Sequence, residues 1–399
     1  MLTDVLVGVA ALPVSFANAY LWLLTVFSGR MPAPKYRLPR RRFAIVVPAH
    51  DEEAGIAATV KNLLGIAYPK EMFSVVVVAD NCSDRTSALA EEAGARVLVR
   101  QDENLRGKGY ALLHAFNLLA PEVDALVVVD ADTIVSSNLL AAFSARLDAG
   151  ADVVQADYAV RNPEASWRTR LMAIAFGAFH VLRSAARERL RFSCGLRGNG
   201  MCFSSKILSV VPYDAFSVVE DIEYGVRLGE AGQRVHYAGE AHVYGEMVSG
   251  ERASRSQRSR WERGRTALAQ AHALPLLRRA LARRDWILAD LAADLLVPPL
   301  GTLAAATMVG LTAALLVRYS EGGSIALAIW LANVAVLLAY VLRGWSLSKT
   351  GLRGLLELGC APLYVAWKIW LRLRQPRNPT NWVRTAREGQ DAASPPPAR

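Results

Sequence analysis

Three short apolar runs that each end in acidic residues constrain the fold of this chain more than any other feature. The runs are FAIVVPAHDE at 43–52, FSVVVVADNCSD at 73–84 and ALVVVDADT at 125–133. Helical patterns at 55–65 and 85–95 lie between them. Strands that alternate with helices predict a parallel sheet covered on both faces, in which ligands bind beyond the carboxyl ends of the strands. The three acidic clusters therefore converge on one edge of the predicted sheet.

The segment DAD at 130–132 is a candidate metal site. Carboxylate oxygens suit hard divalent ions such as Mg²⁺ or Mn²⁺, which in turn bridge the phosphate oxygens of a nucleotide sugar. A lone DxD is also common in solvated turns. This one follows five apolar residues typical of a buried strand, and that position favours metal binding.

The segment RGKGYAL at 106–112 places Lys108 between two glycines. The glycines allow the backbone to approach a ligand closely, and the lysine supplies a point charge for a phosphate. The segment is not a Walker motif, because the required GK[ST] is absent. By itself it indicates a phosphate contact only weakly, since glycine–lysine turns are common.

The segment VVED at 218–221 supplies a pair of acids, Glu220 and Asp221. Acidic residues are favourable at the start of a helix, so the pair could simply cap the helical pattern that follows. Asp221 could also act as a general base beside an acceptor hydroxyl. The two interpretations are compatible.

The composition combines a net charge of +10 with 53% hydrophobic residues. This combination favours membrane segments with basic residues near their cytoplasmic ends, and a nucleic-acid-binding protein is the alternative. The arginine-rich stretch at 255–265 lacks the aromatic series of a nucleic-acid surface, so we expect no nucleic-acid partner. The four cysteines form no CxxC pair, and we expect free thiols without zinc or disulfides.

Residues 5–27 form an uncharged run long enough to cross a bilayer. Asp4 precedes the run and six basic residues follow it between 30 and 42, whereas a signal peptide would have positive charge before the run. We therefore expect a retained transmembrane anchor over 1–29, with the N-terminus outside and the next domain in the cytoplasm.

A second apolar zone begins near residue 286, where Asp290 and Asp294 predict an interfacial position or packing on protein. The later segment at 355–371 has basic residues at both ends, which argues against a simple span. The predicted order is interfacial helices over 275–296, two transmembrane helices over 297–342, an interfacial or re-entrant helix over 355–371 and a disordered tail over 388–399.

Three further segments are interpreted from their pattern. The amphipathic, basic helix predicted at 166–190 should lie against the membrane surface or the interfacial helices. The glycine-rich segment at 195–204 precedes the ED pair. The remaining arginines near the tryptophan of the 255–265 stretch are interpreted as a solvated or lipid-facing basic helix: Arg258, Arg263 and Arg265.

In chain order, Asp80, the DAD at 130–132, the ED at 220–221 and QRSRW at 257–261 resemble the four-part signature of membrane-bound family-2 glycosyltransferases. Cellulose, hyaluronan, chitin-oligosaccharide and poly-N-acetylglucosamine synthases share this signature, as do ceramide glucosyltransferases, and its last part is Q(Q/R)xRW. The resemblance covers roughly 43–270. It implies an α/β, Rossmann-like GT-A domain of the nucleotide-diphospho-sugar transferase type, together with transmembrane helices.

The resemblance also implies that the glycine-rich segment at 195–204 forms a loop and a strand near the acceptor, and it implies a role for each matching residue. Asp221 is the expected catalytic base, with Glu220 and Trp261 on the acceptor side, and Asp132 and Asp130 are the expected metal ligands. The residues expected to bind the donor are Asp51, Glu52, Asp80, Lys108, Asp130, Gln257 and Arg260. His242 could complete the metal site or be an ordinary core or surface histidine, and it is left out of the predicted set.

The expected function is inverting, metal-dependent transfer of a sugar from a nucleotide-sugar donor, UDP-linked by family default, to a growing poly- or oligosaccharide. The site would be the cytoplasmic face of the inner (plasma) membrane, where a multi-pass enzyme could meet polysaccharide-export partners. The alternative is a single transfer to a lipid acceptor, as in ceramide glucosyltransferases. A non-catalytic membrane scaffold is a weaker alternative, because the set of acidic residues is complete.

Overall fold

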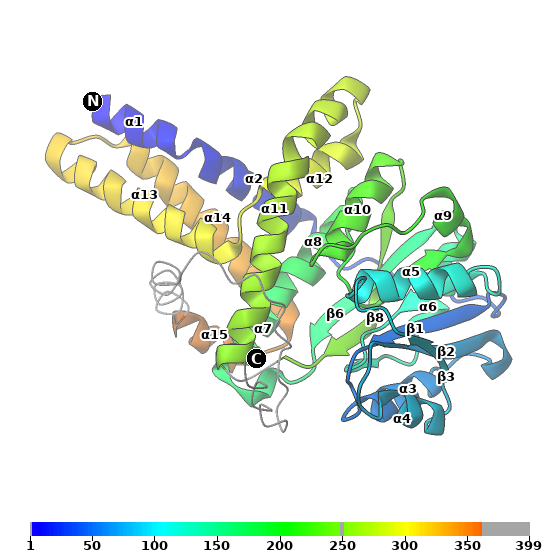
Figure 1. Ribbon diagram of the computed structural model, residues 1–399. Helices are drawn as coiled ribbons and strands as arrows, with labels where there is room; N and C mark the ends of the chain where they lie inside the picture. The colour runs from blue at the N-terminus through cyan, green and yellow to red at the C-terminus, as the bar shows by residue number, and fades with distance from the viewer. Residues whose placement is uncertain (1, 248–250, 361–399) are drawn as a thin grey trace.

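The structure, a computed structural model, describes residues 2–247 and 251–360, and only the backbone over 251–260. An eight-stranded sheet with helices on both faces forms one part of the molecule, and a bundle of long helices projects from it (Figure 1). The predicted tail at 388–399 and the part of the predicted re-entrant helix beyond 360 lie outside the described residues.

The first half of the sheet confirms the predicted parallel strands. Its neighbouring strands all run in the same direction: β3 (Arg96–Arg100), β2 (Phe73–Asp80), β1 (Phe43–Ala49) and β4 (Ala125–Val128). Alternate side chains of a strand point to opposite faces. Ile45 and Val47 therefore pack against α3 (Ile56–Leu64), whereas Ala44 and Val46 pack against α5 (Lys108–Leu119).

The second half of the sheet is mixed rather than parallel. Its strands are β7 (Met201–Ser204), β6 (Val153–Val160), β8 (Val235–Gly245) and β5 (Thr133–Val135). Strand β7 runs antiparallel to both β4 and β6, and β5 runs antiparallel to β8. The segment predicted as a glycine-rich loop and strand is confirmed, because β7 follows directly on the glycines at 195–200.

The helices α13 (Leu300–Glu321) and α14 (Ile325–Ser348), of 22 and 24 residues, are long and apolar enough to cross a membrane. The predicted first span is not one straight helix: α1 (Leu2–Ala10) and α2 (Leu12–Phe27) meet at a bend of 47°. Pro13 lies in the first turn of α2, where its missing N–H favours a break in the helix. The described residues therefore contain two candidate spans, or three if the bent pair is one.

The predicted helix at 166–190 is continuous but lies inside the molecule rather than along a surface. It comprises α7 (Trp167–Phe176), a π-helical segment and α8 (Arg183–Arg189). Its π-helical segment at Gly177–Leu182 packs backbone to backbone on α14, where Gly177 meets Gly344. The hydroxyl of Tyr340 donates to the carbonyl of Ala178 at 3.1 Å. The expected contact with the helices predicted to be interfacial is also present, because α8 reaches α12 (Trp286–Leu296).

The contact between α8 and α12 is a buried ion network. Arg187, whose side chain is 1% exposed, places its Nη2 2.7 Å from Asp294 and its Nε 3.2 Å from Asp290. Arg183 lies 2.9 Å from Asp294, and the Tyr20 hydroxyl of α2 donates to Asp290 at 2.7 Å. The two aspartates that interrupt the apolar zone are therefore packed on protein.

We expect Arg187→Met to destabilise the folded protein by about 3–5 kcal/mol, because it leaves the buried Asp290 carboxylate without its arginine and removes one of the three arginines around Asp294. Arg96→Met is the matched control, since the Arg96–Glu122 pair is half exposed and such pairs contribute about 1 kcal/mol or less. Thermal unfolding in detergent measures both. Equal stability of the two variants would contradict the structural importance of the network.

Candidate active site

The carboxyl ends of β1, β2 and β4 meet at one edge of the sheet, as predicted. Asp51 follows β1, Asp80 ends β2 and Asp130 follows β4. Asp51 and Asn81 both adopt the left-handed conformation, with φ of 52°. Such strained backbone positions cluster at ligand-binding sites, so the two loops carry an independent indication of function.

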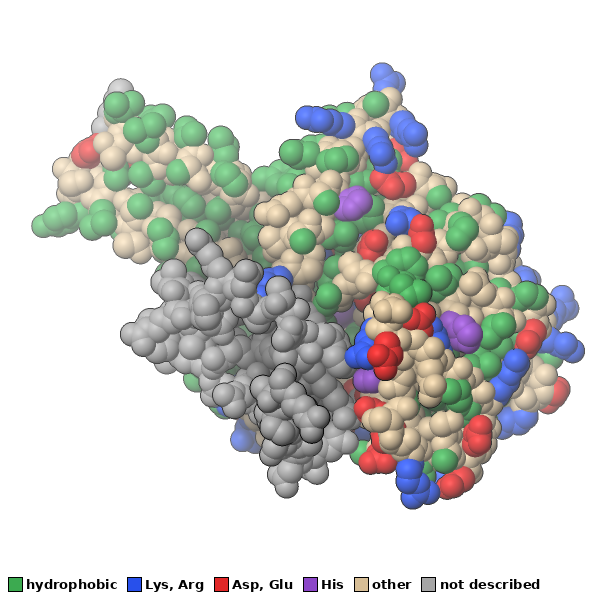
Figure 2. Space-filling view, in the orientation of Figure 1, with side chains coloured by type: hydrophobic (Ala, Val, Ile, Leu, Met, Phe, Trp, Pro, Cys, Tyr) green, Lys and Arg blue, Asp and Glu red, His purple; other side chains and the backbone are tan. Residues whose placement is uncertain are grey.

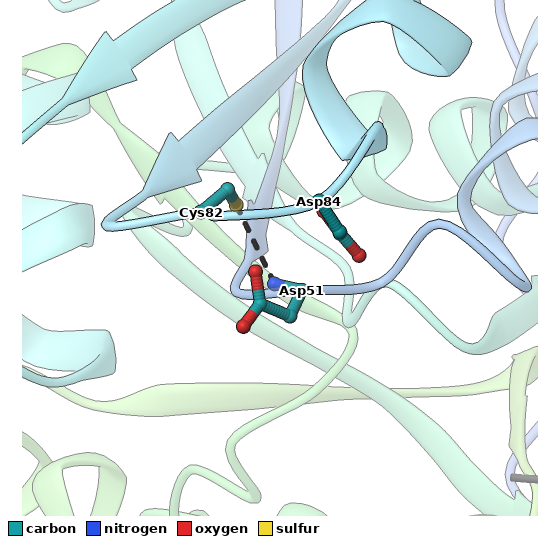
Figure 3. A group of neighbouring side chains, drawn as sticks. All are labelled: Asp51, Cys82 and Asp84. Carbon is teal, nitrogen blue, oxygen red and sulfur yellow. Dashed lines mark hydrogen bonds between the residues drawn. The ribbon is translucent and has the colours of Figure 1, made fainter. Parts of the chain in front are cut away.

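Asp51, Cys82 and Asp84 lie close enough together to be considered for a metal ion (Figure 3). Their groups already link the two loops: Asp51 accepts a hydrogen bond from the Ser83 N–H at 2.7 Å, and its own N–H donates to the Cys82 sulfur. Burial raises the pKa of the Cys82 thiol, which keeps it protonated and a poor ligand. We interpret the cluster as a brace between the loops rather than a site for Mg²⁺ or Mn²⁺.

The other two residues expected near the nucleotide lie at the same edge. The backbone N–H of Glu52 donates to the Thr86 hydroxyl at 2.7 Å. The buried carboxylate of Asp80 accepts a hydrogen bond from Arg100 at 2.6 Å. Arg100 in turn lies over the ring of Tyr110, 5.9 Å from its centroid. The negative charge of Asp80 is thus largely offset within the protein.

Lys108 joins the separate motifs of the site. Its ammonium group donates to the Asp130 carboxylate and to the Gly198 carbonyl, each at 2.5 Å, and lies 3.9 Å from the Glu220 carboxylate. The side chain is 26% exposed, so it remains accessible from the site. A contact with the donor diphosphate stays a prediction, because the contacts present here are with carboxylates and a carbonyl.

Glu220 and Asp221 open α10 (Glu220–Glu230). The residue at the N-cap position is Val219, and Glu220 and Asp221 lie in the first turn, where acidic residues are favourable. Burial raises the pKa of Glu220 to about 7, against the opposing charge of Lys108, and burial also raises the pKa of Asp221. The Asp221 carboxylate lies directly against Gly198. A Cβ atom added at Gly198 would be 3.5 Å from a carboxylate oxygen of Asp221.

The DAD segment is held by a residue that the sequence analysis did not single out. The side-chain oxygen of Asn199 accepts from the Asp130 N–H at 3.2 Å, and its amide donates to the Thr133 hydroxyl at 2.7 Å. The Tyr158 phenol lies in the field of both carboxylates. Its pKa is raised by burial and by the charges of Asp130 and Asp132. The partly exposed oxygens of Asp130 and Asp132 are the donor type that Mg²⁺ and Mn²⁺ prefer.

His242 lies away from the DAD segment. In the register of β5 with β8, Thr133 pairs with Gly245 and Val135 with Val243. His242 therefore lies beside Ser136, past the end of the paired strands that is opposite to Asp132. Its Nδ1 is 2.8 Å from the Asp157 carboxylate. This geometry supports its omission from the predicted metal set.

The QRSRW segment lies on α11 (Glu251–Arg283), but the side chains of Gln257 and Arg260 are outside the described part of the chain. Trp261 is partly buried. A Cβ added at Gly264 would be 2.9 Å from Val219, so α11 packs against the residue directly before Glu220. The helix that carries Trp261 therefore runs beside the ED motif.

The interpretation of Arg265 as a solvated or lipid-facing residue is wrong. Its side chain is 13% exposed and lies 3.3 Å from the Asp294 carboxylate. Its guanidinium also lies over the ring of Phe179, 5.4 Å from the centroid. The helical pattern alone could not show this, because the partner residues come from distant parts of the chain.

Sequence comparison supports one family. Residues 39–264, more than half of the chain, match "Glycosyltransferase like family 2". The chain is 26% identical over 247 residues to "Probable glycosyltransferase YdaM" of Bacillus subtilis, covering 58% of this chain and 57% of that protein. It is 28% identical over 230 residues to "Beta-monoglucosyldiacylglycerol synthase" of Trichormus variabilis, covering 55% and 48%. The chain thus matches about half the length of these relatives.

A solved structure supports the same fold. The mannosyltransferase PcManGT of Pyrobaculum calidifontis, solved in complex with GDP-Man and Mn²⁺, aligns with a TM-score of 0.55 and 17% identity, over 86% of this chain and 98% of that one. At this identity the likeness concerns the fold alone. Together with the family match, it identifies this chain as a family-2 glycosyltransferase with the GT-A nucleotide-sugar transferase fold.

Proposed function

We propose that the chain is an inverting glycosyltransferase that moves a sugar from a nucleotide-sugar donor to a hydroxyl group of a membrane-bound acceptor. The observation that carries the proposal is the position of Lys108 between Asp130 and Glu220, with Asp221 against the same glycine loop. The residues proposed to bind metal and phosphate therefore lie beside the residue proposed to accept the proton. UDP is proposed as the nucleotide only on the basis of the family resemblance.

The proposed reaction assigns separate tasks to the acidic motifs. Asp130 and Asp132 would hold Mg²⁺ or Mn²⁺, which when bound neutralises the diphosphate leaving group. Asp221 accepts the proton of the acceptor hydroxyl while that oxygen attacks the anomeric carbon and the bond from this carbon to the diphosphate breaks. Attack opposite the leaving group inverts the configuration. Trp261 is proposed to stack on the acceptor sugar or headgroup, and Gln257 and Arg260 to close the donor side.

The arrangement of the helices supports a membrane-bound enzyme with a cytoplasmic catalytic domain. The N-terminus and the link between α13 and α14 lie at the end of the bundle far from the sheet (Figure 1). Most of the side chains coloured by type on the visible face of that bundle are hydrophobic (Figure 2). The basic residues at 30–42 lie at the other end, beside the sheet domain. By the positive-inside rule, this end faces the cytoplasm at the inner membrane.

The turn between α11 and α12 supports the proposed interfacial role of 275–296. Leu281 and Trp286 are each 72% exposed. Exposed arginines surround them, at 278, 279, 283 and 284. Apolar side chains next to arginines are typical of segments that lie in the headgroup region.

Contacts inside the helix bundle favour a lipid acceptor over an exported polymer. Asn18 donates to Asn333 at 2.8 Å, and Asn333 donates to Ser15 at 2.9 Å. The backbone of Gly310 packs directly on the ring of Trp330. The candidate spans thus meet across the bundle, whereas a secreting synthase needs space for its product. A single transfer to a lipid is therefore proposed in place of polymerisation, and it requires no export partner. The name of the Trichormus relative, a glycolipid synthase, agrees with it.

The acceptor class is tested by incubating membranes that contain the protein with a panel of labelled nucleotide sugars. We expect label from one donor in a single lipid-extractable product of fixed mobility. The Asp221→Asn variant is the blank. A ladder of water-soluble products of increasing size would contradict the lipid proposal and support polymer synthesis.

Asp221→Asn should reduce the transfer rate by about 10²–10⁴-fold, because an amide keeps the shape but cannot accept the proton. Nucleotide affinity should stay unchanged. Glu230→Gln is the control, since Glu230 lies in the last turn of the same helix. Wild-type turnover in Asp221→Asn would exclude it as the base.

Two candidate metal sites can be separated by paired variants. Asp132→Asn should remove Mn²⁺-dependent activity, whereas Cys82→Ser should leave the Mn²⁺ requirement unchanged. Chelation with EDTA should stop the wild type, and added Mn²⁺ should restore it. A changed Mn²⁺ requirement in Cys82→Ser would move the proposed site to the Asp51–Cys82–Asp84 cluster.

The raised pKa values of Glu220 and Asp221 predict an unusual pH dependence. Transfer needs the ionised Asp221, and burial raises the pKa of this carboxyl, so kcat should begin to fall at a higher pH than the value of about 4 expected for an ordinary Asp carboxyl. The charge of Lys108 lowers both pKa values, so Lys108→Gln should move this limb to higher pH, and Lys206→Gln should not. An acid limb near pH 4 in the wild type would contradict the assignment.

A further inference from the structure

Gln155 is a completely buried polar side chain in β6, with 0% exposure. Its oxygen accepts a hydrogen bond from the Arg197 N–H at 2.9 Å, and its amide donates to the Asn199 carbonyl at 2.7 Å. One side chain thus binds the backbone on both sides of Gly198. Because a buried amide without partners is costly, these bonds fix the loop relative to the strand.

The residue held in this way touches both sides of the active site. Gly198 has φ of +77°, a conformation that other residues rarely adopt. Its carbonyl accepts the Lys108 ammonium at 2.5 Å, and its Cα faces the Asp221 carboxylate. The contacts of Gln155 therefore determine where this carbonyl points.

Asn199, also 0% exposed, extends these hydrogen bonds to the DAD segment. Gln155 and Asn199 together are called the Gln155–Asn199 brace. Its side chain accepts from the Asp130 N–H and donates to the Thr133 hydroxyl, so it bonds on both sides of Asp132. Thr133 is itself completely buried. The turn that carries the two carboxylates is thereby held at its beginning and at its end.

We propose that Gln155 and Asn199 are positioning residues that orient the Asp130 and Asp132 carboxylates for a divalent ion. This inference rests on the metal-dependent function proposed above. Groups that hold metal ligands in place commonly change metal affinity or activity by about 10–100-fold when they are removed. Neither amide needs to touch the ion, since both act through the backbone and through Thr133.

The test compares Thr133→Val, which keeps the shape but removes the hydroxyl, with Thr133→Ser, which keeps the hydroxyl. Mn²⁺ binding to each purified full-length protein is measured by the loss of the free-ion EPR signal, with UDP present. We expect Thr133→Val and Asn199→Ala to weaken Mn²⁺ binding about 10–100-fold and Thr133→Ser to stay near the wild type. Gln155→Met should weaken it in the same direction.

Asn62→Ala is the matched control. Asn62 also bonds β5, accepting from the Val135 N–H at 2.8 Å, but at the end remote from the DAD segment. It should lose thermal stability without losing Mn²⁺ affinity. If Asn199→Ala or Gln155→Met does not fold, the pair at Thr133 still decides the result.

Two results would overturn the inference, and they are distinguishable. Equal Mn²⁺ affinity in the wild type, Thr133→Val and Asn199→Ala would show that Gln155 and Asn199 do not position the metal ligands. The proposed function would then be unaffected. Absence of Mn²⁺ binding to the wild type itself, with UDP present, would contradict the metal dependence of the proposed function. The positioning role of Gln155 and Asn199 would then be excluded as well.

Discussion

The buried contact of Arg187 with Asp290 and Asp294 is the interaction on which the arrangement of the two parts of this enzyme depends. It joins α8, which belongs to the catalytic domain, to α12, which leads into the candidate spans. Burying these charges is costly unless they are paired, so the geometry of the helices is specified as well as stabilised. Because α12 also packs along α11, the same contact fixes the helix that carries Trp261 beside the ED motif.

The network also has an electrostatic consequence for catalysis. Arg183, Arg187 and Arg265 share Asp294, and Arg197 lies close enough for its charge to be felt there. Burial and the neighbouring Arg187 lower the pKa of Arg197 to about 10, which leaves it charged at neutral pH. Its charge favours the ionised form of Asp221 and so opposes the effect of burial on the proposed base. The arginines near the junction with α12 thus contribute to the field at the candidate active site.

Lys108 performs a related task within the site. Its single charge lies between carboxylates from the DAD and ED motifs, which would otherwise repel each other across the glycine loop. This arrangement lets the acidic residues for which we propose metal binding and proton acceptance occupy one small volume. The Gly198 carbonyl completes the coordination of the lysine and ties its position to the loop that Gln155 and Asn199 hold.

The sequence by itself determined the parallel half of the sheet, the edge at which the acidic residues gather and the apolar helices, because strand and helix periodicity and strand-end chemistry are local properties. It also supplied the family, through motifs that keep their order along the chain. Only the tertiary structure decided that Arg265 is paired with Asp294 and mostly covered, that the first apolar run is bent and that His242 lies away from the DAD segment. The brace of Gln155 and Asn199 belongs to this second group. Its contacts join residues more than 40 positions apart, and only the strand register and the loop between two antiparallel strands bring them together.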